Sequence, residues 1–150
     1  MQKLIIPNNE LFDEVCRLLE EGKRVSILAK GNSMLPFIRG GRDSVLLEKA
    51  PENLQRGDIV LFKTEGHYVL HRILHIDEDH VTLMGDGNLK GQEHCSRKEV
   101  LGKAVRIMPP GKAAVNCNKP YERMKAALWR LLLPLRRYLL GCYRRIYKTY

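Results

Sequence analysis

Long hydrophobic runs are missing from this chain of 150 residues. No stretch reaches the roughly 18 uncharged apolar residues that mark a transmembrane helix, so the sequence predicts no full membrane span. The N-terminus, MQKLIIPNNELFDEV, has neither the apolar core nor the small-residue cleavage site of a secretory signal. These absences predict a cytoplasmic protein and leave open a peripheral contact with a membrane surface.

Cysteine is scarce and scattered, and none of the four cysteines belongs to a Cys-x-x-Cys motif. They are Cys16, Cys95, Cys117 and Cys142. Disulfide scaffolds and structural zinc sites need recurring, closely spaced cysteines, so this pattern predicts reduced thiols in a cytosolic compartment. We also predict no bound cofactor.

Three histidines, His67, His71 and His75, raise the question of a metal site. On a helix, histidines four residues apart share a face and could bind one ion. This segment is apolar and β-branched, which indicates a strand, and four residues of a strand span about 13 Å. That separation is too long for one set of ligands, so we predict no metal ion.

Acidic residues are almost absent from the C-terminal end. Residues 121–150 contain eight Lys or Arg and one acid, Glu122, and therefore carry +7 of the net charge of +9. Apolar residues recur here at intervals of three or four, which indicates an amphipathic helix, and Pro134 predicts a kink in it. The apolar stripe consists of Met124, Leu128, Leu131, Leu135 and Leu139.

Two interpretations of this basic tail remain open. It is either an ordinary helix docked on the protein with a solvated basic face, or an interfacial helix on an anionic membrane surface. One tryptophan and four tyrosines favour the second, because such rings settle at membrane interfaces. They are Trp129, Tyr138, Tyr143, Tyr147 and Tyr150. Nucleic-acid binding is a weaker alternative, since the chain has no further nucleic-acid motif.

What the chain does contain is one helix followed by closely spaced strands. A stripe of leucine and valine predicts the helix over residues 9–21. Short apolar segments between turn-rich pieces predict six strands, at residues 24–29, 44–48, 58–63, 68–76, 80–84 and 100–108. The predicted fold is therefore mostly β, in the α+β class: a compact mixed β-sheet or partial barrel.

Pro109-Pro110-Gly111 breaks the strand pattern and suggests a boundary. We predict a domain over residues 1–111, which includes the N-terminal helix, and a basic amphipathic helical tail over residues 112–150.

The segment GNSMLP, residues 31–36, places a serine on a glycine-led turn directly after an apolar strand. Serine is common in turns, so Ser33 alone fits a structural role as well as a nucleophile held at a strand end. A nucleophilic serine needs a base, and the base needs a group that orients it. The strand VLHRILHI supplies His71, and the turn GDGN supplies Asp86.

The residues alone leave other assignments open. Asp77 and Asp79 compete with Asp86 for the role of the acid, because aspartate is common in any hairpin turn. Lys63 is a second candidate for the base, on the neighbouring strand. Arg72 is expected to be structural, paired with a carboxylate or with the backbone.

Four motifs in order, GNSMLP, RGDIVLF, HRI and GDGN, resemble the superfamily of serine peptidases formed by signal peptidase I and the LexA-type repressors. The resemblance covers roughly residues 25–107, about the whole β domain. It implies the fold of the LexA C-terminal domain, with Ser33 as nucleophile, His71 as general base and Asp86 as the residue that orients the imidazole.

Two details of the motifs refine this resemblance. Histidine stands before Arg72 where bacterial signal peptidases and the repressors have lysine, which is similar to the endoplasmic-reticulum and SipW-like branch. The turn of Gly31, Asn32 and Ser33 would supply backbone N–H groups for an oxyanion hole.

The resemblance implies a serine endopeptidase that cleaves a peptide bond through an acyl-enzyme on Ser33. Its partner would be an extended peptide or protein segment that adds as a strand, with small side chains near the cut. The alternative is a catalytically idle module on the same fold that binds a peptide or a membrane. Self-cleavage and a transcription role are not expected, because the 32 residues before Ser33 contain neither Ala-Gly nor Cys-Gly and no helix-turn-helix.

Overall fold

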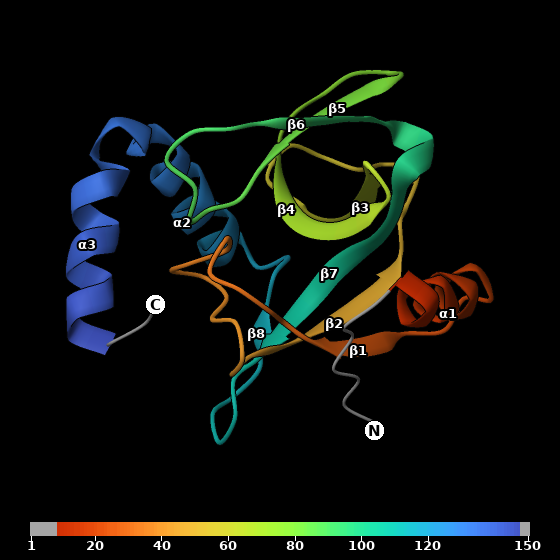
Figure 1. The fold of residues 1–150 in the computed structure, drawn as a ribbon, viewed down its shortest axis with the longest axis horizontal. Helices are drawn as coiled ribbons and strands as arrows, with labels where there is room; N and C mark the ends of the chain where they lie inside the picture. Colours follow the sequence, from red (N-terminus) through yellow and green to blue (C-terminus); the bar gives the residue numbers. More distant parts are fainter. Residues whose placement is uncertain (1–8, 148–150) are drawn as a thin grey trace.

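The computed structural model describes residues 9–147, and Figure 1 shows their arrangement. The helices are α1 (Asn9–Glu20), α2 (Pro120–Leu131) and α3 (Arg136–Tyr147), with short 3-10 turns η1 (Arg97–Glu99) and η2 (Leu133–Leu135). The strands are β1 (Val25–Leu28), β2 (Ser44–Lys49), β3 (Ile59–Thr64), β4 (His67–Ile76), β5 (His80–Met84), β6 (Glu93–Ser96), β7 (Val100–Met108) and β8 (Val115–Asn116).

The strands form one antiparallel sheet in the order β1-β2-β7-β3-β4-β5-β6, with β8 paired to β7. The sheet curls strongly at β3 and β4, and α1 lies beside β1 and β2 (Figure 1). The mostly-β fold of the α+β class, with helices at its two ends, is thereby confirmed.

Two apolar clusters fill the fold. The first lies between α1 and the sheet, where Val15 and Leu19 are almost fully buried because they fall on one helical face. The second lies within the β3–β6 part and centres on Phe62 and Ile73. Strand β4 crosses from one cluster to the other, and its register with β5 shifts between Ile73 and His75.

The six predicted strands are each found within one residue of their predicted ends, and the N-terminal helix within one residue as well. Strands β6 and β8 were not predicted, and β8 extends the sheet beyond the proposed boundary at Gly111. The single kinked C-terminal helix is instead two helices, because the chain changes to a 3-10 turn around Pro134.

Within residues 9–147, the helices all fall short of the length and apolarity that a bilayer span requires.

Candidate functional site

Two turns meet at the candidate site. The Ser33 turn follows β1, the Gly85–Asn88 turn follows β5, and the Gly87 N–H donates to the Ser33 carbonyl at 2.8 Å. A Cβ atom on Gly85 would lie 2.3 Å from the Ser33 carbonyl oxygen, and one on Gly87 would lie 2.3 Å from that of Asn32. Both positions must therefore lack a side chain, so the glycines of the GDGN motif are required by close backbone contact.

His71 lies on β4 directly beside these turns. Its ring is buried, packs near Phe62, and holds Nδ1 at 2.9 Å from Glu93 Oε2. Its other nitrogen, Nε2, lies 3.1 Å from the position that a Cβ on Gly85 would occupy, on the side of the Ser33 backbone. When Nδ1 donates to the carboxylate, Nε2 is the nitrogen with a lone pair, and it lies beside Gly85.

Ser33 itself is half-buried and lies in the loop of residues 29–43. Backbone hydrogen bonds join the two ends of this loop. The Ala29 N–H donates to the Asp43 carbonyl at 2.9 Å, and the Gly41 N–H donates to the Ala29 carbonyl at 2.8 Å. Gly31, two residues before the serine, has a φ of 71° and so adopts the left-handed conformation that favours glycine. The loop is thus fixed at both ends, which restrains the serine.

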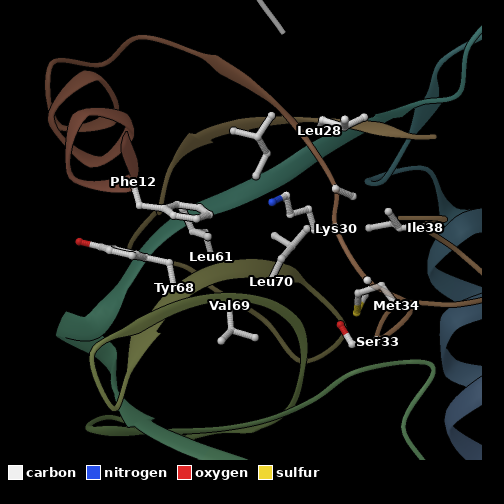
Figure 2. Close-up of a pocket in the computed structure, with 13 residues that line it drawn as sticks. Phe12, Leu28, Lys30, Ser33, Met34, Ile38, Leu61, Tyr68, Val69 and Leu70 are labelled. Carbon is white, nitrogen blue, oxygen red and sulfur yellow. The ribbon is translucent and has the colours of Figure 1, made fainter. Parts of the chain in front are cut away.

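A groove of about 270 Å³ leads away from Ser33. Figure 2 shows Ser33 at one end of it and Phe12 and Tyr68 at the other. One wall is β1 with its exit, and the opposite wall is residues 68–70 of β4. The lining is mostly apolar, and Lys30 is its basic exception.

Both walls of this groove have strand edges that carry no partner strand among the described residues. Strand β1 pairs with β2, and residues 67–70 of β4 pair with β3, while the pairing of β4 with β5 begins only at Arg72. Such edges are where an extended peptide adds to a sheet.

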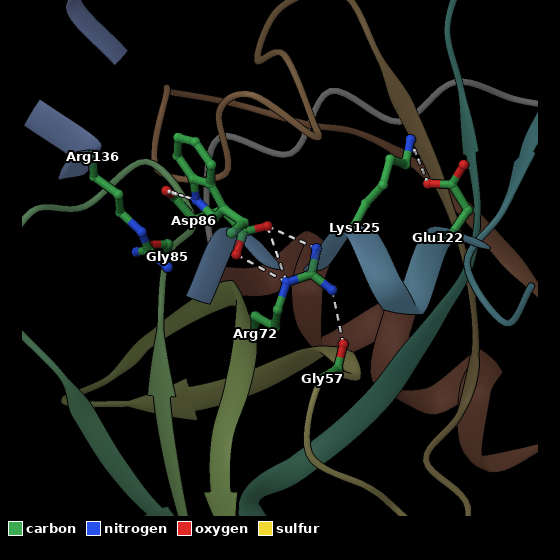
Figure 3. Close-up of polar contacts among 8 residues, drawn as sticks. Gly57, Arg72, Gly85, Asp86, Glu122, Lys125 and Arg136 are labelled. Atoms are coloured by element: carbon green, nitrogen blue, oxygen red, sulfur yellow. Dashed lines mark hydrogen bonds and ion pairs between the residues drawn. The ribbon is translucent and has the colours of Figure 1, made fainter. Parts of the chain in front are cut away.

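Asp86 does not lie against His71. Its carboxylate accepts bonds from Arg72 Nε at 2.9 and 3.1 Å and from Arg72 Nη2 at 2.7 Å, and Arg72 Nη1 donates to the Gly57 carbonyl at 2.8 Å (Figure 3). Successive side chains of a strand point to opposite faces, so a carboxylate that pairs with Arg72 lies on the wrong face of β4 for His71. The structural role predicted for Arg72 is confirmed, and the imidazole contact predicted for Asp86 is replaced by Glu93.

Glu93 is the site residue that the sequence interpretation missed. It lies on β6, which was not predicted, and it pairs with Leu83 of β5. Strand β5 in turn pairs with β4, so two successive antiparallel pairings bring Glu93 beside His71. A single glutamate after a glycine-rich loop carries no local signal for this placement.

The remaining candidates lie elsewhere. Asp77 accepts the N–H groups of Asp79 and His80 at the tip of the β4–β5 hairpin, and both aspartates are exposed there. Lys63 is exposed with Nζ 5.2 Å from the Tyr68 ring centre, at the end of the groove opposite Ser33. None of these three side chains approaches the Ser33 turn.

Helices α2 and α3 contact the Gly85–Asn88 turn of the site. Trp129 Nε1 donates to the Asp86 carbonyl at 2.7 Å. Arg136 Nη1 donates to the carbonyls of Gly85 at 3.4 Å and Asn88 at 3.2 Å, and Figure 3 shows Arg136 beside Gly85. Arg136 is 2% exposed, and burial lowers the pKa of its guanidinium. Three carbonyls of the GDGN turn are thereby held by side chains of α2 and α3.

A curled antiparallel sheet that carries a serine turn, a buried histidine and a carboxylate on that histidine defines a serine-peptidase-like domain. The model of the Peptidase S24-like family matches residues 7–105, so this chain belongs to that family. The match supports the resemblance to the LexA and signal-peptidase superfamily and ends before α2 and α3 begin. No curated protein matches the chain.

Proposed function

We propose that this protein is a serine endopeptidase in which Ser33 is the nucleophile, His71 the general base and Glu93 the acid that orients the imidazole. One observation carries the proposal: Glu93 lies 2.9 Å from His71 Nδ1, and His71 Nε2 lies beside Gly85, where the Ser33 carbonyl also packs. A base oriented by a carboxylate and directed at a serine is the arrangement that nucleophilic catalysis requires.

The reaction begins when the Ser33 hydroxyl attacks the carbonyl carbon of a peptide bond and His71 Nε2 accepts its proton. The tetrahedral oxyanion would be stabilised by backbone N–H groups of the turn of Gly31, Asn32 and Ser33. The Ser33 N–H is a suitable donor, because it bonds to no backbone carbonyl within residues 9–147.

The C–N bond then breaks, and His71 gives the proton to the leaving amine. Water, activated by the same imidazole, hydrolyses the ester on Ser33 and regenerates the hydroxyl. The acid of this arrangement is Glu93, and Asp86 has the structural role of holding Arg72.

The substrate in this proposal is an extended peptide lying in the groove between β1 and residues 68–70 of β4. The free strand edges would supply main-chain hydrogen bonds, and the apolar walls would accept alternate side chains. Small side chains near the cut remain an expectation from the superfamily. The His71-Arg72 pair supports the branch with histidine as base, to which the endoplasmic-reticulum and SipW-like enzymes belong.

The test is the intact mass of the protein after incubation with a fluorophosphonate probe, which reacts with activated serines. The variants are Ser33→Ala and His71→Ala, and His75→Ala is the matched control because it removes an exposed histidine from the same strand. We expect a single adduct on the wild type and on His75→Ala, and none on the other two.

No adduct on the wild type, with or without anionic vesicles, would overturn the proposal. That result would favour the alternative, a catalytically idle module on the same fold that binds a peptide or a membrane. An adduct that persists in Ser33→Ala would assign the reactive serine to another position.

A further inference from the structure

Large apolar side chains are exposed in one part of the molecule. Among the described residues, every such side chain except Leu89 belongs to residues 121–147. Leu89 itself joins them, because it lines one shallow hollow with Leu133, Pro134 and Tyr138. A concentration of exposed apolar surface of this kind marks an interaction site.

The two faces of α2 explain the pattern. The inner face holds Ala126, which is buried, and Arg123, which donates to Asp58 at 2.8 Å. The opposite face carries a stripe at intervals of three and four residues, in which each side chain is more than half exposed. We name it the α2 stripe: Tyr121, Met124, Leu128 and Leu131.

Positive charge is concentrated in the same segment. Residues 120–147 contain seven Lys or Arg and one acid, Glu122. Two of the arginines point inward, Arg123 to Asp58 and Arg136 to the GDGN turn, whereas Arg137, Arg144 and Arg145 are exposed. The hollow lined by Leu89 also contains Lys90 and Arg137, so basic and apolar groups alternate there.

We propose that the outer surface of the C-terminal helices, formed by the α2 stripe and the hollow of Leu89, Lys90 and Arg137, docks on an anionic membrane surface. The exposed leucine, methionine and tyrosine side chains can insert among lipid tails. The arginines between them can bind anionic headgroups, and the segment has only one acid to oppose this. A second copy of the chain fits poorly, because an isologous contact would bring two strongly basic segments together.

Trp129 is not part of this surface. It faces the protein body and bonds to the Asp86 carbonyl. Of the aromatic anchors expected from the sequence, Tyr138 is exposed, and Tyr121 is exposed as well. Leu89 lies two residues after Gly87, whose N–H contacts the Ser33 carbonyl. Docking would therefore hold the Ser33 end of the groove near the lipid surface, although the proposal does not depend on peptidase activity.

The experiment is co-sedimentation of the full chain with vesicles of phosphatidylcholine alone or mixed with phosphatidylserine. The variants are Leu128→Glu/Leu131→Glu and Arg137→Glu. Lys98→Glu is the matched control: it also lowers the net charge by two, and η1 lies at the opposite side of Figure 1 from α3. Thermal melts confirm that each variant is folded.

We expect the wild type and Lys98→Glu to bind the anionic vesicles only, and to be released by high salt. Binding by Arg137→Glu should fall at least about fivefold, and binding by the double variant at least about tenfold. Equal binding by all four proteins, or no binding by the wild type, would overturn the proposal. A wild-type dimer in light scattering that Leu128→Glu/Leu131→Glu dissociates would instead assign the surface to a second copy.

Discussion

The two sides of strand β4 each hold a basic side chain against an acid, and the two pairs differ in burial. On one side His71 contacts Glu93, whose side chain is 29% exposed. On the other side Arg72 holds Asp86, whose side chain is 2% exposed and is covered by α2. The first pair has a nitrogen that can exchange a proton, whereas the second is a permanent ion pair.

Two consecutive residues of β4 therefore differ in their expected roles: His71 belongs to the candidate site, and Arg72 holds neighbouring segments together. On the His71 side, the imidazole lies beside Gly85, where the Ser33 carbonyl also packs. On the other side, Arg72 bonds to the Gly57 carbonyl and to the Asp86 carboxylate, and Trp129 of α2 donates to the Asp86 carbonyl, which joins the Gly57 turn, the GDGN turn and the C-terminal helices. Substitutions on the two sides should therefore affect different measurements.

The largest effect is expected from Asp86→Asn. The change leaves the buried Arg72 without its carboxylate, and breaking a buried ion pair in this way costs about 3–5 kcal/mol of unfolding free energy. Urea unfolding would measure the loss. Asp77→Asn is the control, and it should leave the urea midpoint close to that of the wild type because Asp77 is exposed. Equal effects of the two variants would contradict the anchoring role.

The second-largest effect is expected from Gly85→Ala, which should disturb both the candidate site at His71 and the structural pair of Arg72 and Asp86. The added Cβ would lie 2.3 Å from the Ser33 carbonyl oxygen, so the Ser33 turn must move. We expect about 1–3 kcal/mol of lost stability from overpacking and about a 10²-fold slower fluorophosphonate reaction from the displaced serine. Gly141→Ala in α3 meets no atom within 4 Å and should leave both quantities intact.

Glu93→Gln tests the reactive side alone. Without the carboxylate the imidazole loses its orienting partner, and the fluorophosphonate reaction should slow by about 10²-fold. Because Glu93 is partly exposed, the unfolding free energy should change by less than about 1 kcal/mol. Glu93→Asp should recover part of the rate. A full wild-type rate in Glu93→Gln would remove Glu93 from the mechanism.

The smallest effect concerns Cys117, beside Asp58 and Arg72 on the anchored side. Burial raises the pKa of this thiol to about 11. The unfolded chain therefore loses the proton first as the pH rises, so stability is intact below about pH 8.5 and declines towards pH 11. The full shift would correspond to about 3 kcal/mol at pH 11. Because Cys117 is only partly buried, we expect the wild type to lose about 1 kcal/mol more than Cys117→Ser between pH 8 and 11 in urea unfolding. Parallel pH curves would show that the thiol is not buried.

Local patterns account for most of the secondary structure. Alternation and turn residues predict β1 to β5 and β7, because each strand carries its own apolar signal. Strand β6 has the sequence EHCS and only Cys95 is buried in it, so it has no such signal. The two-residue strand β8 is too short for any pattern, and its pairing with β7 defines it.

The candidate site divides in the same way. Ser33 and His71 stand in recognisable motifs. The structure places Ser33 at one end of the groove, and His71 beside Gly85, where the Ser33 carbonyl also packs. Asp86 also stands in a motif, but its partner depends on which face of β4 the GDGN turn meets. The inward position of Trp129 was likewise undetermined, since an amphipathic pattern does not show which face of a helix the protein covers.

Residue types at short spacing were enough to indicate the family, the order of the strands along the chain and the candidates Ser33 and His71. Only the tertiary structure decided that Glu93 contacts His71, that Asp86 contacts Arg72, and that the leucine-rich face of α2 points outward. These three facts depend on strand pairing and docking between segments far apart in the sequence, and no local pattern encodes such contacts.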